Sequence, residues 1–395
     1  MKQTYVMAIA GILIGLAVGA GIAWVAKPTA SPGPDWVSKT DFDNLQNSYN
    51  SLQTDRNNIN GNLTAARAQI AELTKPIKIG LVLATGGLGD KSFNDIAYAG
   101  MLRAKTELNI TFDYVQPAAI AEYAGFQTGF ASTGQYALIV CIGFDQADAL
   151  NATATTYPNQ KFAIVDMVVS LPNVASLVFK ANEGSFLTGV VAGMLTNTGK
   201  VGFVGGMDIP LIRDFYVGYK AGVEWANASA TVLDPVFVGG WADPTKAKEL
   251  TVSLIGLGVD SVFSAAGKSG LGALEAAHEN GIMGYGVDAC QDYLYPEIKA
   301  SMTKRVDNAV FEMVQGAVIS KLLPNLQTGG FKAGIYNGGV KEKWTGCSRL
   351  PEEEPIWEST FNFTETPLPG NVVTKLTDAR DRIVSGNITV PSGYA

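Results

Sequence analysis

The side chains best suited to binding or chemistry stand where short apolar runs of this sequence end. Phe93 and Asn94 follow the glycine-rich turn ATGGLGDK (84–91), while Asp166 and Asp288 each close an apolar run. Carboxylates and amides offer several hydrogen-bonding positions to a polar ligand, and an aromatic face buries a flat ring. The sequence shows none of the usual spacings of a nucleophile with its base or of metal ligands. The pattern therefore favours a binding site, without catalytic residues, cofactor or metal.

Composition excludes several classes of protein. The 395 residues include one histidine, His278, and three cysteines without a Cys-x-x-Cys spacing, which argues against histidine chemistry and a zinc site. The net charge of −7 argues against a nucleic-acid binder, because such proteins need a basic surface. Hydrophobic residues make up 47% of the chain and charged ones 16%, so a large core is available, and the length predicts two or three domains.

Short apolar runs alternate with amphipathic segments from residue 76 onward. The predicted strands are 77–84, 111–115, 137–143, 162–168 and 175–179, then 201–207, 232–240, 261–267 and 283–288. The predicted helices are 92–108, 183–197, 213–228, 244–257, 270–280 and 305–322. Continuous apolar strands separated by helices indicate parallel sheets with both faces covered. Two such series predict two similar α/β lobes, with a ligand cleft at the carboxyl ends of the strands.

These series set the expected domain organisation. We expect a first lobe over 76–198, which part of 305–335 completes, a second lobe over 199–304, and a C-terminal segment over 336–395 whose final helix packs on the lobes. Ser92 and Asp95 have the spacing of a capping box, with Asp90 as a loop or cap residue. Lys304 is predicted to follow a polar turn and to open helix 305–322. The alternative for each strand-end residue is an ordinary core, capping or solvated role.

The first 75 residues predict an anchor and a stalk. Residues 5–26 hold no charge and are numerous enough to cross a bilayer, so 1–27 is expected to be a transmembrane helix with the body outside the cell. The alternative is a cleaved signal peptide. In the linker and stalk (28–75), apolar residues keep a seven-residue repeat, which favours a coiled coil through which copies self-associate. The alternative is a single extended helix lying on the next domain.

The cysteines and the glycosylation sequons bear on the same topology. No cysteine follows the apolar run, so a lipid-bearing cysteine is not available there. Cys141 lies in an apolar run and is predicted to be a buried thiol, while a disulfide between Cys290 and Cys347 stays open as an alternative. Asn-x-Ser/Thr sequons, which agree with an extracellular glycoprotein, occur at Asn62, Asn109, Asn151, Asn227, Asn362 and Asn387.

Several linked motifs carry a resemblance to a known family. They are GDKSFND (89–95), NEGSFLTG (182–189), VGFVGGMDIPLIRDFYVGYKAGV (201–223), ADPTKA (242–247), GVD (286–288), SMTKRVD (301–307) and LTDARDRIVSGNITVP (376–391). In these motifs the chain resembles the basic membrane protein family, whose members are substrate-binding proteins of ABC transporters and whose characterised members bind purine nucleosides. The resemblance covers about 78–325, together with the ending 376–391, and implies a two-lobed α/β type 1 periplasmic-binding-protein fold with parallel sheets.

The resemblance also assigns roles to residues on both sides of the cleft. It implies that Phe93 and Phe215 sandwich the purine from opposite lobes. It further implies that Asn94 and Asp166 hydrogen-bond the edge of the base. Such an arrangement is consistent with the physical chemistry, because aromatic faces bury a flat ring while polar side chains meet its edge.

On the ribose side the resemblance implies that Asp288 and Lys304 hold the hydroxyls and that Gly267 lines the site. Trp241 is an additional aromatic residue beside the expected cleft. The chain departs from the family at Leu83-Ala84-Thr85 (83–85), where members carry an aspartate, so one ligand-facing carboxylate is missing.

These observations lead us to expect an extracytoplasmic solute-binding protein that closes on a nucleoside and presents it to an ABC permease, with no enzymatic activity. One alternative is a membrane-anchored nucleoside sensor, or a binding protein associated with a surface layer, without transport. Another is a nucleoside hydrolase. That enzyme needs an Asp-rich calcium cluster at its first strand end, where this sequence reads GGLGD (86–90) with a single carboxylate.

Overall fold

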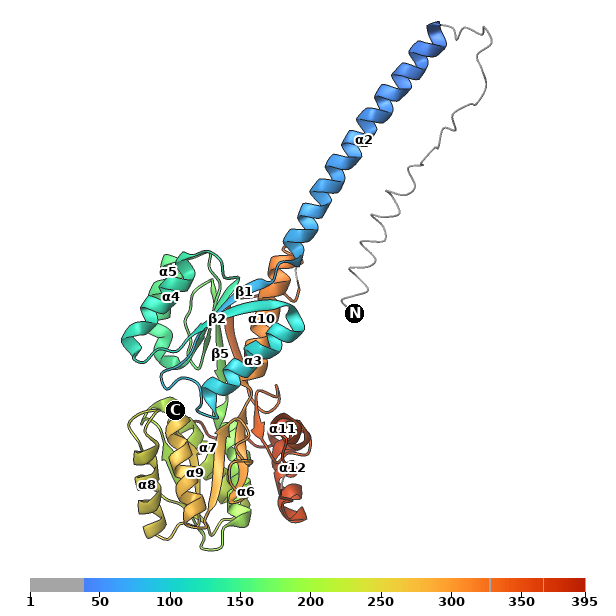
Figure 1. Cartoon of the computed structure of the whole chain (residues 1–395). Coiled ribbons are helices and arrows are strands. Elements are labelled where there is room, and N and C mark those ends of the chain that lie inside the picture. Colours follow the sequence, from blue (N-terminus) through green and yellow to red (C-terminus); the bar gives the residue numbers. More distant parts are fainter. Residues whose placement is uncertain (1–38, 327, 365, 395) are drawn as a thin grey trace. The chain divides into compact units, whose positions relative to one another are not determined.

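The computed structural model describes residues 39–326, 328–364 and 366–394 (Figure 1). The chain divides into two units, Met1–Thr74 and Lys75–Ala395. The described part of the first unit is one helix, α2 (Lys39–Thr74). A helix is therefore present where the stalk is predicted, and its pairing into a coiled coil stays a prediction. The predicted anchor lies outside the described residues, and among the described helices none has the length and apolar character needed to cross a bilayer.

The first lobe of the second unit contains a six-stranded parallel sheet in the order β12-β5-β4-β3-β1-β2. Its strands are β1 (Ile77–Val82), β2 (Ile110–Val115), β3 (Leu138–Ile142), β4 (Phe162–Val165), β5 (Val174–Phe179) and β12 (Gly334–Gly338). Helices α3 (Phe93–Leu108) and α10 (Val306–Leu322) cover one face, and α4 (Tyr123–Ser132) and α5 (Ala147–Thr156) cover the other.

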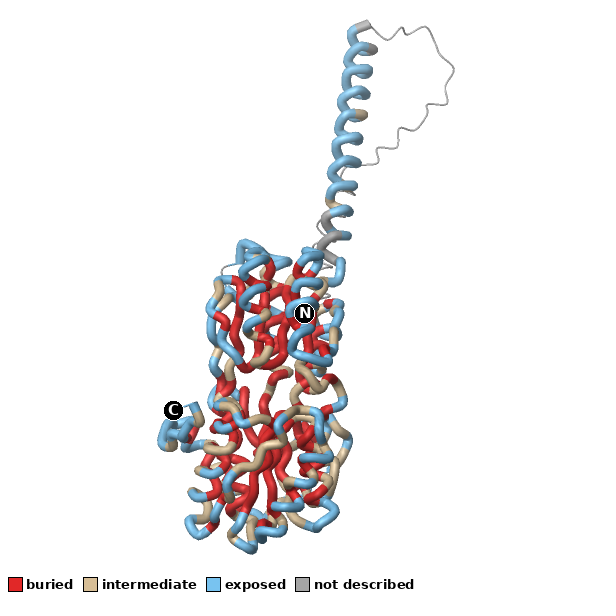
Figure 2. The backbone as a smooth tube through the Cα atoms, turned by 90° about the vertical axis from the view of Figure 1, so that its left-hand side faces the viewer, coloured by how far each residue is buried: buried red, intermediate tan, exposed pale blue. Residues whose placement is uncertain are grey.

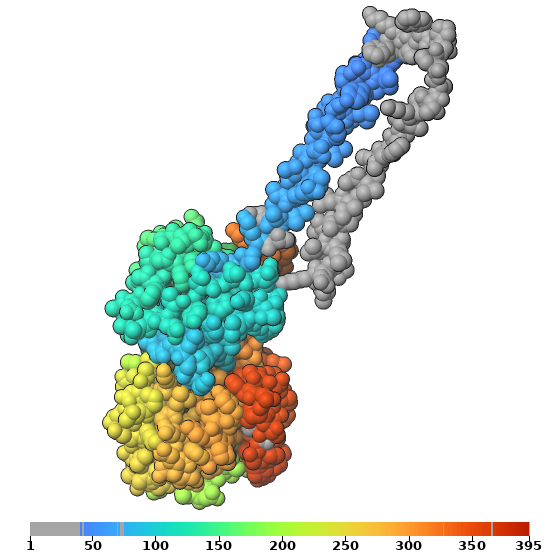
Figure 3. Space-filling model, viewed as in Figure 1, coloured from blue at the N-terminus to red at the C-terminus, as the bar shows by residue number. Residues whose placement is uncertain are grey.

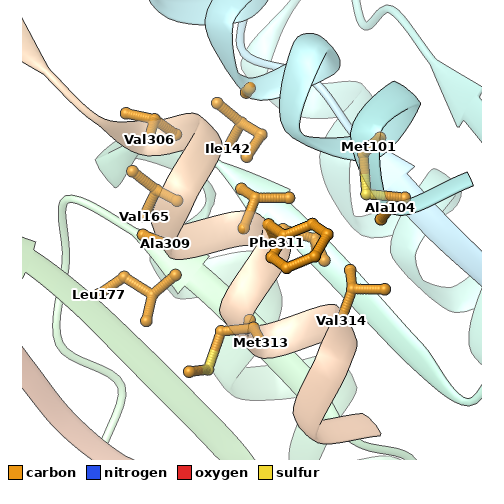
Figure 4. Close-up of a cluster of buried hydrophobic side chains, with 14 of the residues drawn as sticks. Met101, Ala104, Ile142, Val165, Leu177, Val306, Ala309, Phe311, Met313 and Val314 are labelled. Carbon is orange, nitrogen blue, oxygen red and sulfur yellow. The ribbon is translucent and has the colours of Figure 1, made fainter. Parts of the chain in front are cut away.

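Alternation along the central strand β3 shows why these runs are apolar throughout. Leu138 and Val140 pack with the core under α3 and α10, while Ile139 and Cys141 pack with the core under α4 and α5. Successive side chains of a strand point to opposite faces, so a strand with both faces covered needs apolar residues at every position. Figure 4 shows Val306 and Ala309 of α10 among the side chains of this core.

The second lobe has a sheet in the order β13-β11-β10-β9-β6-β7, with β8 paired to β6 and β13 antiparallel to β11. Its strands are β6 (Lys200–Gly205), β7 (Thr231–Val232), β8 (Val236–Phe237), β9 (Ser261–Ala265), β10 (Met283–Asp288), β11 (Ile298–Lys304) and β13 (Thr345–Cys347). Helices α6 (Ala181–Leu195), α7 (Pro210–Ala226) and α12 (Gly370–Val384) pack on one face, and α8 (Pro244–Gly256) and α9 (Gly270–Glu279) on the other. Both sheets form the buried interior of their lobes (Figure 2).

Helix α6 corrects the predicted boundary between the lobes. The sequence places 183–197 in the first lobe, whereas α6 packs against α7 in the core of the second. Glycines on both helices make this close contact possible. A Cβ on Gly222 would stand 2.0 Å from the carbonyl oxygen of Phe186, and a Cβ on Gly189 would stand 2.2 Å from the carbonyl oxygen of Tyr219. Only glycine allows two backbones to approach so closely. The first crossing between the lobes therefore lies between β5 and α6, not at 198.

The chain crosses between the lobes again after β11 and after β12, and hydrogen bonds join these crossing segments. The amide of Lys180 donates to the carbonyl of Gly338 at 2.9 Å, and that of Arg305 donates to the carbonyl of Trp344 at 2.8 Å. The C-terminal segment divides between the lobes, because Trp357 of α11 (Glu354–Phe361) joins the core of the first and α12 that of the second.

Two further predictions differ from the structure, and one alternative that the sequence left open is decided. Lys304 is the last residue of β11, a strand that the sequence analysis misses, and does not open α10. The predicted strand 232–240 is instead the two short strands β7 and β8. No disulfide links Cys290 and Cys347, since these buried thiols belong to the cores of different lobes. Cys141 is a buried thiol, as predicted.

Candidate ligand-binding site

A pocket lies between the two lobes, at the carboxyl ends of strands from both sheets. The lobes meet directly in the space-filling view, the first in cyan and green and the second in yellow and orange (Figure 3). The pocket holds about 640 Å³ of space, open solvent included. All the residues predicted for the site line it: Phe93, Asn94, Asp166, Phe215, Trp241, Gly267, Asp288 and Lys304.

Each lobe supplies one aromatic wall of the pocket. Phe93 is the first residue of α3, and Phe215 lies in the second turn of α7. The ammonium nitrogen Nζ of Lys304 lies 4.8 Å from the centroid of the Phe93 ring and 5.7 Å from that of Phe215. Both distances are within the range of about 6 Å for a cation–π contact. The two rings therefore approach the same point from opposite lobes.

Lys304 forms a buried ion pair with Asp166 across the cleft. Nζ lies 2.5 Å from Oδ2, and the two side chains are 2% and 5% exposed. The other carboxylate oxygen, Oδ1, is buried and has no hydrogen-bond partner among the described residues. An unsatisfied buried acceptor is costly, so Oδ1 is an open position for a donor on a ligand. The resemblance joins Lys304 with Asp288, whereas the structure pairs it with Asp166.

Asp288 links the lobes through a second polar contact. It ends β10 and accepts a hydrogen bond from the hydroxyl of Ser92 in the first lobe at 2.5 Å. Burial raises the pKa of Asp288 to about 6, and the nearby ammonium of Lys304 opposes this rise. Asp166 and Asp288 have φ angles of 71° and 65°, a left-handed conformation in which Asp and Asn are enriched. Both carboxylates are thus held at the strand ends by an uncommon backbone.

The capping box predicted at Ser92 is wrong. The Ser92 side chain caps no helix nitrogen, because it is turned toward Asp288 in the second lobe. Asp90 does the capping: its carboxylate accepts the backbone N–H groups of Ser92, Asn94 and Asp95 at 3.0, 2.8 and 3.1 Å. The cap orients Asn94, whose Oδ1 accepts the backbone N–H of Ala84 at 2.9 Å. The NH₂ group of Asn94 is then the donor available to a ligand.

Trp241 lines the pocket and contacts an aromatic residue of the opposite lobe. It follows β8 of the second lobe, and its ring meets that of Phe144 in the first lobe edge-on, with centroids 6.3 Å apart. Gly267, which has a φ of 55°, lies beside it: a Cβ there would stand 3.8 Å from Cε3 of the indole. The positive φ of Gly267, which L side chains rarely adopt, favours glycine at this position, whereas the distance to the indole is an ordinary van der Waals contact.

Sequence reasoning missed several residues that line the pocket. They include Thr85, Phe144, Asp145, Leu211, Ile212 and Lys268. Phe144 and Asp145 follow Gly143, just beyond the end of β3. Because ligands of such folds bind at the carboxyl ends of strands, the position of these two residues in the sequence could have indicated them. Among the residues that the structure describes, no group of three or more His, Cys, Asp and Glu side chains is placed to hold a metal ion.

One protein family matches most of the body of the chain. A profile of the family described as "ABC transporter substrate-binding protein PnrA-like" matches residues 77–349, from β1 to just beyond β13. The chain belongs to this family. The resemblance drawn from the sequence motifs is thereby confirmed. As a substrate-binding protein of the ABC transporter class, it binds a ligand and has a permease as partner.

Individual relatives agree with this assignment. Basic membrane protein A of Borreliella afzelii is 33% identical over 288 residues, which cover 71% of this chain and 85% of that protein. An uncharacterized lipoprotein of Pyrococcus horikoshii is 32% identical over 287 residues, or 69% of each chain. A solved solute-binding protein of an ABC transporter system from Aeropyrum pernix matches with a TM-score of 0.68 and 29% identity, covering 80% of this chain and 94% of that one. The α/β fold is thus that of ABC solute-binding proteins.

Proposed function

We propose that this substrate-binding protein captures a purine nucleoside between its lobes and delivers it to an ABC importer, without transforming it. The observation that carries the proposal is the pair of aromatic walls, Phe93 and Phe215, around the buried Lys304–Asp166 pair. A flat base stacks well between two rings. The edge of a base carries both hydrogen-bond donors and acceptors. The unpartnered Oδ1 of Asp166 can accept a hydrogen bond from this edge, and the NH₂ group of Asn94 can donate one to it.

The charge of the pocket supports a neutral ligand over a phosphorylated one. Its charged lining residues are Asp90, Asp145, Asp166 and Asp288 against Lys268 and Lys304. Lys304 is already paired with Asp166, so a phosphate group would meet an excess of carboxylates in a partly desolvated space. Like charges repel strongly there. A nucleoside fits this balance better than a nucleotide does.

Closure of the lobes is the mechanism we propose for capture. Ser92 donates to Asp288, Lys304 pairs with Asp166, and the side-chain amide of Gln291 donates to the carbonyl of Lys91 at 3.2 Å. Each contact joins residues of opposite lobes, which supports a closed conformation. A ligand held by both lobes favours this state over an open one by its additional contacts.

Calorimetry of the purified protein tests the proposal directly. We expect guanosine, inosine or adenosine to bind more tightly than cytidine or free ribose. Phe215→Ala is expected to weaken binding by about 1–3 kcal/mol, the scale of one lost base–aromatic stack. Phe112→Ala, which removes a partly buried ring packed against the first core, is the matched control and should leave the affinity unchanged. Absence of binding for all nucleosides would refute the proposal.

Two further measurements separate the alternatives. Release of free base from a bound nucleoside would show the hydrolase activity that we propose is absent. Normal nucleoside uptake by cells that lack the protein would favour a sensor over a transport component.

We also propose that residues 1–27 tether the body to the outer face of the cell membrane.

Helix α2 is further proposed to pair with α2 of a second copy of the chain. The exposed fractions of Leu45, Leu52 and Ile59 on α2 are 71%, 67% and 46%. They occupy one position of a seven-residue repeat, the pattern that buries such side chains against an identical helix. Leu45→Lys combined with Leu52→Lys in the full chain should convert a self-associated species into a monomer in analytical ultracentrifugation. A wild-type chain that sediments as a monomer at all concentrations would refute the pairing.

A further inference from the structure

Asp145 is a pocket-lining carboxylate to which neither the sequence motifs nor the proposed contacts assign a role. It lies in the short 3₁₀ turn Phe144–Gln146 that follows β3 in the first lobe. We infer that Asp145 selects the base of the ligand by accepting a hydrogen bond from an N–H group on its edge. This inference rests on the proposed nucleoside-binding function and specifies which bases the site prefers.

Buried groups of the first lobe hold the Asp145 carboxylate in place. The backbone N–H of Thr85 donates to the phenol oxygen of Tyr123 at 2.9 Å, and the Tyr123 hydroxyl donates to Oδ2 of Asp145 at 3.1 Å. Tyr123 is completely buried, and desolvation raises the pKa of its hydroxyl, so the phenol stays protonated and keeps its role as donor. Asp145 is thus fixed through Oδ2.

The second oxygen of Asp145 lies on the side of the aromatic wall. A Cβ on Gly143 would stand 3.0 Å from Oδ1 of Asp145, 3.3 Å from Cβ of Ala84 and 3.8 Å from Cε1 of Phe93. Oδ1, the small Ala84 methyl and the edge of the Phe93 ring therefore surround one point. A base stacked on Phe93 would present its edge close to Oδ1. The φ of 111° at Gly143 requires glycine there, and a side chain at this position would also crowd Oδ1 of Asp145.

The chemistry of a carboxylate determines which base it accepts. An ionised carboxylate accepts hydrogen bonds and donates none, and each of its oxygens has two acceptor positions. Guanosine and inosine offer an N–H in the ring, guanosine adds an adjacent amino group, and purine riboside offers no donor on the base. A site with a carboxylate at this edge favours the donors, because a base without them leaves the desolvated oxygen unsatisfied.

Titration calorimetry with guanosine, inosine and purine riboside tests the inference. For the wild-type protein we expect purine riboside to bind about 10- to 100-fold more weakly than inosine, the scale of one hydrogen bond to a charged group. Asp145→Asn keeps the shape and, with its oxygen still facing Tyr123, turns an NH₂ donor toward the base. This variant should abolish the preference for inosine or reverse it. Asp148→Asn, at an exposed position three residues later, is the matched control and should keep it.

A second variant, Ala84→Asp, shows whether an effect of Asp145→Asn comes from the lost carboxylate or only from altered packing. Its carboxylate would enter the same space as Oδ1 of Asp145. We expect Ala84→Asp alone to weaken inosine binding and to restore the preference for inosine when it is combined with Asp145→Asn. An unchanged ratio of inosine to purine riboside affinity in Asp145→Asn would overturn the inference while leaving the nucleoside function intact. A wild-type protein that binds none of the three ligands would refute the proposed function, and this inference with it.

Discussion

Replacing Asp288 with asparagine is expected to stabilise the ligand-free protein at neutral pH while weakening ligand binding. The Asp288 side chain is buried at the end of β10 and accepts a hydrogen bond from the Ser92 hydroxyl at 2.5 Å. Asparagine keeps the shape and an acceptor oxygen for Ser92. It also tolerates the φ of 65° at this position. The main change is the loss of a negative charge that burial disfavours.

The magnitude follows from the pKa of Asp288, which burial raises from 3.8 to about 6. At 1.36 kcal/mol for each tenfold change in the ionisation constant, ionising the buried group at pH 7 costs about 3 kcal/mol of stability. Because the folded pKa lies above the unfolded one, the folded protein holds this proton more tightly. The resulting stabilisation is fully present below about pH 4 and is lost as pH rises toward 6. For a body of roughly 320 residues, 3 kcal/mol corresponds to about 4 °C in Tm.

Thermal unfolding followed by circular dichroism, without ligand, between pH 4 and pH 8 measures this effect. The Tm of Asp288→Asn should equal that of the wild type near pH 4 and exceed it by about 4 °C at pH 7. The exposed Asp148→Asn is the control and should show no such divergence. With nucleoside present, the wild type should gain more in Tm than Asp288→Asn. A difference in Tm that is independent of pH, or a less stable variant at pH 7, would refute the reasoning.

Three other predictions follow from the contacts of the lobes. Lys304→Ala leaves the Asp166 carboxylate buried without its cation, so urea unfolding should show a loss of about 3–5 kcal/mol, and calorimetry should show no remaining preference for ribo- over deoxyribonucleosides. Gly222→Ala forces a Cβ to within 2.0 Å of a backbone oxygen and should lower the free energy of unfolding by more than about 2 kcal/mol in urea unfolding. Gly125→Ala, at a position in helix α4 with open space around it, is the control and should leave this free energy unchanged or raise it. Trp241→Ala, which removes a lining side chain that contacts both lobes, should increase the dissociation rate of the ligand about tenfold in stopped-flow measurements, since affinity changes at one interface act mainly on dissociation; an unchanged rate would contradict a role of Trp241 in retaining the ligand.

The residues of the pocket that sequence reasoning found share a local signal. Phe93, Asp166 and Asp288 each stand at the carboxyl end of an apolar run or just beyond the turn that follows one, and the parallel topology gathers such ends at one edge of each sheet. Lys304 was found through the family motif, because the strand that carries it was not recognised.

Strand β11 was missed because its polar residues are satisfied only by distant partners. The Ser301 hydroxyl donates to Asp292 at 2.5 Å, and that of Thr303 donates to Glu353 at 2.7 Å. In sequence, IKASMTK (298–304) has the polarity of a turn, yet six of its seven residues are buried. Burial of polar side chains is possible only when hydrogen-bond partners arrive from elsewhere in the chain. Glu353 comes from the run 352–354, which the sequence alone gives no reason to place beside a strand.

The sequence by itself determined the α/β class, most of the strands, the family and the residues that gather at the cleft, because apolar periodicity and short motifs are local properties of the chain. Only the tertiary structure decided that α6 belongs to the second lobe, that Ser92 contacts Asp288 instead of capping α3, and that Lys304 pairs with Asp166. These facts depend on which surfaces meet after folding. The approach of two glycine-lined helices and the pairing of charges far apart in the chain leave no periodic trace in sequence.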